Sequence, residues 1–264
     1  MRVPVFHVNA FAPQPFAGNP AAVCPLNGWL DDQMLRKVAA ENNLSATAFF
    51  VPQENHYQLR WFTPRCEIRL CGHATLASAY VLLNLLQPGL KAVRFETRSS
   101  AILTVHKDDA LFSMNFPAMF PKPCTNVPDD FFQALGHGPL PAEVLEANDT
   151  YIAVYEAESA IRSLRPNFAR LESLHPYAVA VTAPGEQIDF VSRYFAPSYG
   201  VPEDPVTGSV HCALAPYWAD RLGKERLRAL QVSDRGGELW CDVAGNRIVL
   251  KGLAVLTLQG SLQL

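Results

Sequence analysis

Two segments of the chain place a proton-carrying side chain beside a glycine that begins an apolar, helix-like run. In the first, His73 follows Gly72; in the second, Asp204 lies four residues before Gly208. An imidazole and a carboxylate can each accept a proton and return it, so His73 and Asp204 are candidate catalytic residues for acid–base chemistry. The dipole at a helix N-terminus disfavours positive charge, and we therefore expect His73 to be neutral.

The two glycines also indicate a site for an anion. The first turn of a helix has unpaired backbone N–H groups and the positive end of the helix dipole. Glycine at that turn lets a ligand come close to the backbone. Two such helix starts that face each other could hold one carboxylate from both sides, which makes Gly72 and Gly208 candidate substrate-binding residues. The alternative is that each glycine only forms a tight turn.

Four polar side chains near these turns have two interpretations each. Pro205 restricts the backbone after Asp204, so that carboxylate either points at a ligand or braces its loop or helix. Ser209 either donates a hydrogen bond to a ligand or caps its helix. Asn19, in a Gly-Asn-Pro turn, and Ser45 either reach a ligand or close their loops.

The chain also repeats itself. Arg60-Trp-Phe-Thr-Pro64 ends one strand-like segment, and Arg193-Tyr-Phe-Ala-Pro197 ends another 133 residues later. An acidic loop follows each proline, and each loop leads to one of the two glycines, which are 136 residues apart. Because strand, proline, acidic loop, glycine and apolar helix recur in the same order, we interpret the chain as a duplicated domain.

The elements around these motifs predict two barrel-like sheets. The stretches after Gly72 and Gly208 are apolar on nearly every face, which is typical of helices buried on all sides, and Pro216 is expected to kink the second. Residues 31–43 predict an outer helix capped by Asp31 or Asp32. The strand-like segments are Val3–Asn9, Ala21–Pro25, Ala48–Pro52, Val93–Thr97, Ala101–Val105 and Leu111–Asn115, then Ile152–Tyr155, Ala178–Thr182, Glu238–Val243, Arg247–Lys251 and Ala254–Gln259.

The expected fold class is therefore α+β, with two similar barrel-like β domains that each wrap around a central helix in a pseudo-twofold arrangement. Four prolines between residues 117 and 128 suit a linker. We place an N-terminal domain at 1–117 and a C-terminal domain at 118–264, with the terminal strands free to pack on either half.

The composition excludes several classes of partner. The chain has 264 residues and a net charge of −3 without a basic run, so nucleic acid and anionic membrane surfaces are not expected partners. No apolar run reaches the roughly 20 residues that cross a bilayer, and the start lacks a signal-peptide pattern. The six cysteines form no CxxC pair, which favours neither a zinc site nor a disulfide framework, and we expect a reducing cytoplasm.

Five segments together resemble the phenazine-biosynthesis, PhzF-like family of isomerases. They are Gly18-Asn-Pro-Ala-Ala-Val23, Asn43-Leu-Ser-Ala-Thr-Ala-Phe49, Arg60-Trp-Phe-Thr-Pro64, Glu67-Ile-Arg-Leu-Cys-Gly-His-Ala-Thr-Leu76 and Glu203-Asp-Pro-Val-Thr-Gly-Ser209. The resemblance implies a diaminopimelate epimerase-like fold, a homodimer, and isomerisation of a dihydro-hydroxyanthranilate without metal or organic cofactor. It also implies that His73, Asp204 and Ser209 are site residues and that the two helix starts hold the substrate carboxylate.

One position departs from the family pattern. The proton-moving glutamate of the family stands between a serine and a threonine, where this chain has Ala46. A methyl group carries no proton, so the usual route is closed. Either Ala46 replaces the natural residue, or activity has been lost, or another group such as Asp204, His73 or, less readily, Glu41 has taken over the role.

These readings leave three hypotheses for the function. The first is an isomerase that moves protons on a small carboxylate. The second is a non-catalytic protein that keeps the pocket for a small acid. The third is a two-thiol epimerase that uses Cys71, but the second repeat has Thr207 where its partner thiol should stand.

Overall fold

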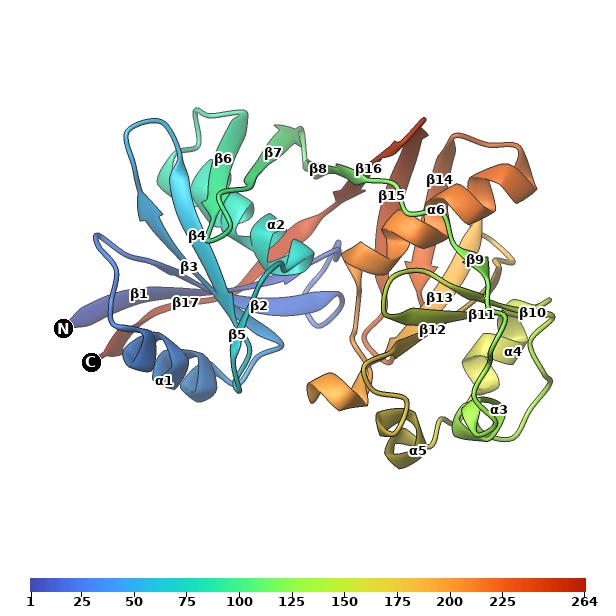
Figure 1. Ribbon diagram of the computed structural model, residues 1–264. Helices are drawn as coiled ribbons and strands as arrows, with labels where there is room; N and C mark the ends of the chain where they lie inside the picture. The colour runs from blue at the N-terminus through green and yellow to red at the C-terminus, as the bar shows by residue number, and fades with distance from the viewer. The chain divides into compact units, whose positions relative to one another are not determined.

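The structure is a computed structural model that describes all residues from 1 to 264. It divides into two compact units, residues 1–115 with 251–264, and residues 116–250 (Figure 1). The last strand, β17 (Ala254–Gln263), pairs with β1 (Arg2–Ala10) and therefore lies in the first unit, a crossover that the sequence left open. No helix is long and apolar enough to span a membrane.

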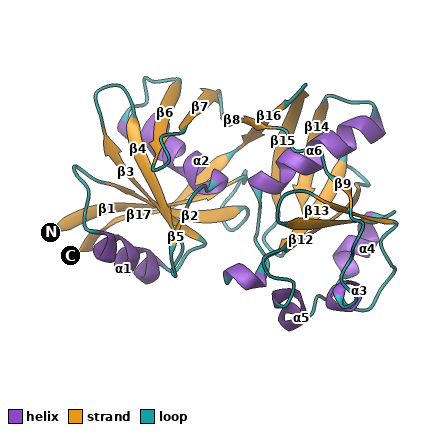
Figure 2. Cartoon of the chain, viewed as in Figure 1, coloured by secondary structure: helices purple, strands orange, loops and turns teal.

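Short strands and few helices make up both units (Figure 2). Besides β1 and β17, the first contains β2 (Asn19–Pro25), α1 (Asp32–Asn42), β3 (Ala46–Pro52), β4 (Tyr57–Phe62), β5 (Glu67–Ile68), α2 (Gly72–Tyr80) with a π-helical turn (Val81–Leu86), β6 (Ala92–Thr97), β7 (Ile102–Asp108) and most of β8 (Leu111–Pro117). The second contains β9 (Lys122–Pro123), α3 (Phe131–Ala134), β10 (Glu143–Glu146), β11 (Thr150–Val154), α4 (Glu158–Ser163), α5 (Phe168–Glu172), β12 (Ala178–Pro184), β13 (Phe190–Phe195), a 3-10 turn (Pro197–Tyr199), α6 (Gly208–Leu222), β14 (Arg226–Gln231), β15 (Gly237–Ala244) and most of β16 (Arg247–Gly252).

The two units repeat one order of strand pairing. In the first, β1 is antiparallel to β2, β2 parallel to β3, β3 antiparallel to β4, β4 parallel to β6, and β6 antiparallel to β7. In the second, β10 to β15 follow one another with the same alternation of antiparallel and parallel pairs. The duplication inferred from the sequence is therefore present in the topology.

In the first unit a helix packs on each face of the sheet. Helix α2 contacts β1, β2, β3 and β17, and its residues from His73 to Ala79 are all buried, as its apolar sequence predicted. Helix α1 covers the opposite face, where Leu35 and Val38 pack with Phe49 and Phe62. Because both faces are covered, β2 and β3 are buried along nearly their whole length. Asp31 caps α1, its carboxylate accepting a 2.8 Å hydrogen bond from the N–H of Met34.

In the second unit α6 is the buried helix that begins at the repeated glycine, as α2 is in the first. It contacts β14 and β15. A separate core lies on β11, β12 and β13, and helices α3, α4 and α5 contribute to it. Pro216 lies inside α6 and cannot donate to the carbonyl of Cys212. The N–H of Met119 donates to that carbonyl at 2.9 Å, so the helix continues from Gly208 to Leu222 with this group satisfied.

Candidate active site

The turn before β2 places Asn19 at the start of that strand. Gly18 has φ +68°, and a Cβ atom there would lie 2.3 Å from the carbonyl oxygen of Ala10, so only glycine fits. Asn19 follows as the first residue of β2 and is fully buried. The amide is thereby fixed at one end of the strand.

Ser45 meets Asn19 because β2 and β3 run parallel. Ala21 pairs with Ala46, so the chain just before β3 reaches the same end of the sheet as the start of β2. The Ser45 hydroxyl lies 2.7 Å from Asn19 Oδ1 and 2.7 Å from the carbonyl oxygen of Pro20. Both are acceptors, so one of them takes the single hydroxyl hydrogen.

His73 completes this group from the first turn of α2. Its Nε2 lies 3.3 Å from Ser45 Oγ, and its Nδ1 lies 3.4 Å from Cys71 Sγ. Since the hydroxyl hydrogen of Ser45 goes to an oxygen, Nε2–H donates to Ser45 and Nδ1 is left as an acceptor facing the thiol. The hydrogen bonds thus favour one neutral tautomer.

The protein environment keeps that imidazole uncharged. His73 is only 9% exposed, and burial lowers its pKa to about 4. At neutral pH the ring is therefore neutral, as its place at a helix N-terminus predicted. Neither His73 nor Ser45 contacts a carboxylate; their polar partners are Asn19, Pro20 and Cys71.

Ala46 lies at the first position of β3, directly after Ser45. It is completely buried, and its backbone pairs with Ala21. Its methyl group supplies no proton acceptor beside the imidazole.

Gly72 leaves the start of α2 open. No atom of the surrounding chain lies within 4 Å of a Cβ built at Gly72, and its φ is not positive. Neither packing nor backbone conformation requires glycine here, which speaks against a simple tight turn. The open backbone N–H groups of this turn are what an anion would contact.

The second unit contains its own group of site residues around Asp204. Asp204 Oδ2 accepts a 2.5 Å hydrogen bond from the hydroxyl of Thr207, the N-cap residue of α6. The buried side chain of Gln231 makes two hydrogen bonds to the backbone of the same loop. Its Nε2 donates to the Asp204 carbonyl at 2.6 Å, and its Oε1 accepts from the Thr207 N–H at 2.9 Å. Gln231 was not predicted from the sequence, although it follows the inward-facing Leu227 and Ala229 at alternate positions of β14.

Gly208 and Ser209 open α6 directly after this loop. Gly208 is buried, whereas Ser209 is exposed and its hydroxyl has no hydrogen-bond partner in the chain. The capping interpretation of Ser209 is therefore wrong, because Thr207 occupies the N-cap position and Ser209 stands inside the first turn. A free hydroxyl remains available to a ligand.

An arginine–glutamate pair braces each of the two loops. Arg60 Nε and Nη2 bond the two carboxylate oxygens of Glu67 at 2.8 Å each, and Arg193 bonds Glu203 in the same way at 2.8 and 2.9 Å. Each guanidinium also lies over the phenylalanine two residues later, 5.1 Å from Phe62 and 5.0 Å from Phe195. The hydrogen bond from Arg60 is the main reason that the pKa of Glu67 is lowered. The repeated Arg-aromatic-Phe motif was the available signal for these pairs.

The two-thiol hypothesis finds no support in this geometry. Cys212 lies inside α6, where burial raises the pKa of its thiol to about 12, so it is no partner for Cys71 in a two-thiol reaction. His211 is packed inside the same helix, 2.7 Å from the Thr207 carbonyl. No three His, Cys, Asp or Glu side chains are grouped so as to hold a metal ion.

Comparison with known proteins finds full-length relatives. The family model described as phenazine biosynthesis-like protein, PhzC-PhzF, matches residues 8–260. An uncharacterised isomerase of Pseudomonas aeruginosa is 52% identical over 264 residues, with both chains covered completely. A solved PhzF-family structure from Enterococcus faecalis is 41% identical, with a TM-score of 0.95 and 100% of both chains covered.

The fold extends to more distant structures. A hydroxyproline epimerase from Agrobacterium vitis, 11% identical, has a TM-score of 0.62 over 98% of this chain and 92% of its own. The expected fold class, two similar barrel-like domains of the diaminopimelate epimerase-like type, is confirmed by these neighbours.

Proposed function

This chain belongs to the phenazine biosynthesis-like, PhzC-PhzF family, and from that membership we propose that it is an isomerase-like protein acting by cofactor-free proton transfer on a small carboxylate. The substrate class is a dihydro-hydroxyanthranilate-like acid. A cytoplasmic homodimer is part of the same proposal.

The Ser45–His73 pair carries this proposal. A neutral imidazole whose Nε2–H is directed at Ser45 keeps an acceptor nitrogen at neutral pH, so it can receive a proton and pass one on. The open turn at Gly72 beside it offers backbone N–H groups to a carboxylate. We assign proton transfer to His73 and Asp204, and substrate binding to Asn19, Ser45, Gly72, His73, Gly208 and Ser209.

Ala46 limits the expected rate. General acid–base catalysis by one positioned group typically contributes about 10²–10⁴-fold, so a chain with alanine at this position should turn over slowly unless His73 or Asp204 replaces the glutamate. A second candidate function follows from the same residue. The buried methyl of Ala46, and the lack of a carboxylate contact to His73 or Ser45, favour a small-acid-binding protein without catalysis.

Hydrogen exchange separates the two candidates. A dihydro-hydroxyanthranilate is incubated with the protein in deuterated water, and deuterium on its ring carbons is followed by mass spectrometry. An active isomerase incorporates deuterium, and Ala46→Glu should raise the rate about 10²–10⁴-fold. Ala46→Gln is the matched control, because it has the same size but cannot carry a proton.

The binding protein would give a different pattern. It binds the stable analogue 3-hydroxyanthranilate in calorimetry, shows no exchange as it stands, and gains exchange only with Ala46→Glu. If neither the native chain nor Ala46→Glu binds the analogue or exchanges deuterium, while all variants remain folded, both candidate functions are wrong.

A further inference from the structure

The hydrogen bonds in the loop before α6 each have one possible direction. The backbone N–H of Thr207 can only donate, so the Gln231 atom that faces it at 2.9 Å is the amide oxygen Oε1. The amide nitrogen Nε2 therefore lies on the other side, 2.6 Å from the Asp204 carbonyl oxygen and 3.4 Å from Thr207 Oγ1. The carbonyl of Thr207 accepts from His211 Nδ1–H at 2.7 Å. Both backbone groups of Thr207 are thus held.

The hydroxyl of Thr207 is left with one acceptor. Its two partners are Gln231 Nε2, which is a donor, and Asp204 Oδ2, which lies 2.5 Å away. The hydroxyl hydrogen therefore goes to the Asp204 carboxylate. This distance lies in the range of about 2.5–2.7 Å for O–H···O⁻ bonds, and a donor to a carboxylate favours its ionised form. Gln231 thereby acts on Asp204 through Thr207.

The neighbouring titratable groups add no net charge beside Asp204. Glu203, the preceding residue, is paired with Arg193 through two hydrogen bonds. Tyr194 interacts electrostatically with Asp204, and its carbonyl accepts from the Asp204 N–H at 2.9 Å. Burial raises the pKa of the Tyr194 phenol to about 12, so this side chain is neutral at pH 7.

The first unit allows a comparison, because it repeats the same strands. Gln231 is the last residue of β14 to pair with β13, and Thr97 is the last residue of β6 to pair with β4. The two residues therefore hold equivalent positions. The hydroxyl of Thr97 lies 2.9 Å from Ser99 Oγ and accepts from the Ala101 N–H at 3.2 Å, so it serves its own turn and makes no hydrogen bond to the loop before α2.

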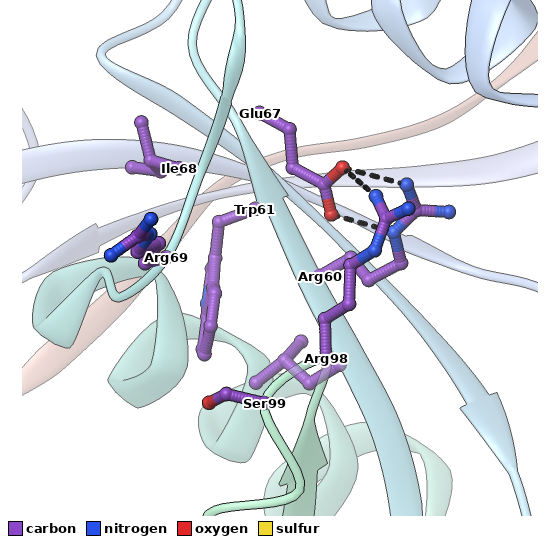
Figure 3. Close-up of a pocket in the computed structure, with 8 residues that line it drawn as sticks. Arg60, Trp61, Glu67, Ile68, Arg69, Arg98 and Ser99 are labelled. Carbon is purple, nitrogen blue, oxygen red and sulfur yellow. Dashed lines mark hydrogen bonds and ion pairs between the residues drawn. The ribbon is translucent and has the colours of Figure 1, made fainter.

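The loop before α2 also lacks the carboxylate. Its glutamate, Glu67, is bonded by Arg60 as Glu203 is by Arg193, and the next residue is Ile68, whose side chain points away from that pair (Figure 3). Ile68 lies four residues before Gly72, as Asp204 lies four residues before Gly208. The clamp made by Gln231 and Thr207 is therefore present in the unit that has the carboxylate and absent from the unit that does not.

Another hydrogen bond of the loop is common to both units. The Thr75 hydroxyl donates to the Cys71 carbonyl at 2.7 Å, just as His211 donates to the carbonyl of Thr207. This bond satisfies the N-cap residue of each helix and belongs to the shared fold. The bonds from Gln231 do not belong to it, so the fold alone does not account for them.

We propose that Gln231 and Thr207 are positioning residues that hold Asp204 as an ionised carboxylate at the start of α6. The consequence for the reaction rests on the proposed function. Asp204 is then the group that takes a proton from the substrate: a C–H bond breaks, its electron pair stays on the substrate, and an O–H bond forms on the carboxylate. Return of that proton at another carbon restores the carboxylate and completes an isomerisation.

Titration of the Asp204 carboxyl carbon tests the positioning without a substrate. In the full-length protein with carbon-13 at the side-chain carboxyl of aspartate, the signal that is absent in Asp204→Asn belongs to Asp204. Thr207→Val has a similar shape but no hydroxyl, and it should move the midpoint of this titration up by about one pH unit. Thr207→Ser keeps the hydroxyl and should restore the native midpoint.

Gln231→Met should move the midpoint in the same direction but by less, because the Thr207 hydroxyl remains and only its direction is no longer fixed. Gln187→Met is the matched control, since Gln187 is exposed and lies in the same unit. This control should leave the midpoint unchanged.

Three results would overturn the proposal: an unchanged midpoint in Thr207→Val, a shift that Thr207→Ser does not reverse, or equal midpoints in Gln231→Met and Gln187→Met. If Gln231→Met fails to fold, the two Thr207 variants decide alone, and if Thr207→Val fails to fold, the two glutamine variants decide.

Deuterium exchange keeps this test distinct from that of the proposed function. If the native chain exchanges, Thr207→Val should slow the exchange about ten-fold with nearly unchanged affinity for 3-hydroxyanthranilate, and Thr207→Ser should restore the rate. An unchanged rate in Thr207→Val would remove Asp204 as the proton acceptor. If no variant exchanges deuterium or binds the analogue, the proposed function is wrong, whereas the titration still decides whether Gln231 and Thr207 position Asp204.

Discussion

Arg193 and Glu203 are joined by two parallel hydrogen bonds of 2.8 and 2.9 Å, and Glu203 is the residue immediately before Asp204. The fork therefore fixes the backbone that carries a proposed catalytic carboxylate. Arg193 also donates to the carbonyls of Ile161 and Leu164, which ties this loop to the end of α4. The Arg60–Glu67 pair performs the equivalent role in the loop that leads to His73.

We expect Glu203→Gln to lower the free energy of unfolding by about 2 kcal/mol, because it leaves a guanidinium that is only 11% exposed without its anion. Glu238→Gln is the control. Its partner Arg228 is 56% exposed, so Glu238→Gln should lower the free energy of unfolding by less than about 1 kcal/mol. Urea unfolding of both variants gives the comparison, and equal losses would show that the Arg193 fork adds no more than a surface ion pair.

The repeat, the two buried helices, the outer helix and most strands could be predicted from the sequence, because they depend on local patterns. The start of α1 is one example: the sequence predicts Asp31 or Asp32 as the cap, and Asp31 is the residue that caps the helix. The place of β17 could not be predicted, because its pairing with β1 joins opposite ends of the chain. Local patterns contain no information about such a contact.

The site residues were predicted individually, but their contacts were not. Asn19, Ser45 and His73 come from three different elements, and they meet only because β2 and β3 pair in parallel beside the start of α2. Gln231 was missed because residues 226–231 were not among the predicted strands, so its place in the alternation of Leu227 and Ala229 was not recognised. Its role becomes visible only when β14 lies beside the loop of Asp204.

Two glycines of the first unit should respond in opposite ways to the same substitution. Gly18→Ala should destabilise the chain by about 2–4 kcal/mol, since its Cβ would lie 2.3 Å from a carbonyl oxygen at positive φ. Gly72→Ala should change the free energy of unfolding by less than about 1 kcal/mol, because its Cβ meets nothing.

Ligand binding should be weakened in Gly72→Ala although this variant keeps its stability. The methyl of Gly72→Ala lies over the open helix start, so the variant should bind 3-hydroxyanthranilate about ten-fold more weakly while it remains folded. Calorimetry on Gly72→Ala and on the native chain checks this. Unchanged affinity would remove Gly72 from the proposed site.

The thiols should differ in their reaction with iodoacetamide. Cys66 is exposed, whereas burial raises the pKa of Cys24 and Cys212 to about 12 and that of Cys241 still further. Since the thiolate is the reactive form, mass spectrometry of the native protein should find Cys66 alkylated first and these three protected. Rapid labelling of Cys212 would reopen the two-thiol hypothesis.

Stability should fall as the solution is acidified from about pH 6.5 to about pH 4. Burial lowers the pKa of both His73 and His211 to about 4, whereas histidine in an unfolded chain titrates near 6.5. Between these values the unfolded chain binds more protons than the folded one, so protons favour unfolding; the stabilisation is complete above pH 6.5 and is lost on the way to pH 4.

Replacing one of these histidines tests the assignment. Between pH 4 and pH 6.5 each of the two histidines should contribute up to about 1.4 kcal/mol per pH unit to the slope of the free energy of unfolding against pH. His73→Gln should remove one of these two contributions. Urea unfolding at several pH values measures the slopes, and the carbon-bound ring protons of His73 should keep their neutral chemical shift down to about pH 5. If His73→Gln and the native chain have the same slope, His73 is not held neutral, and its role as a proton acceptor at neutral pH loses its physical basis.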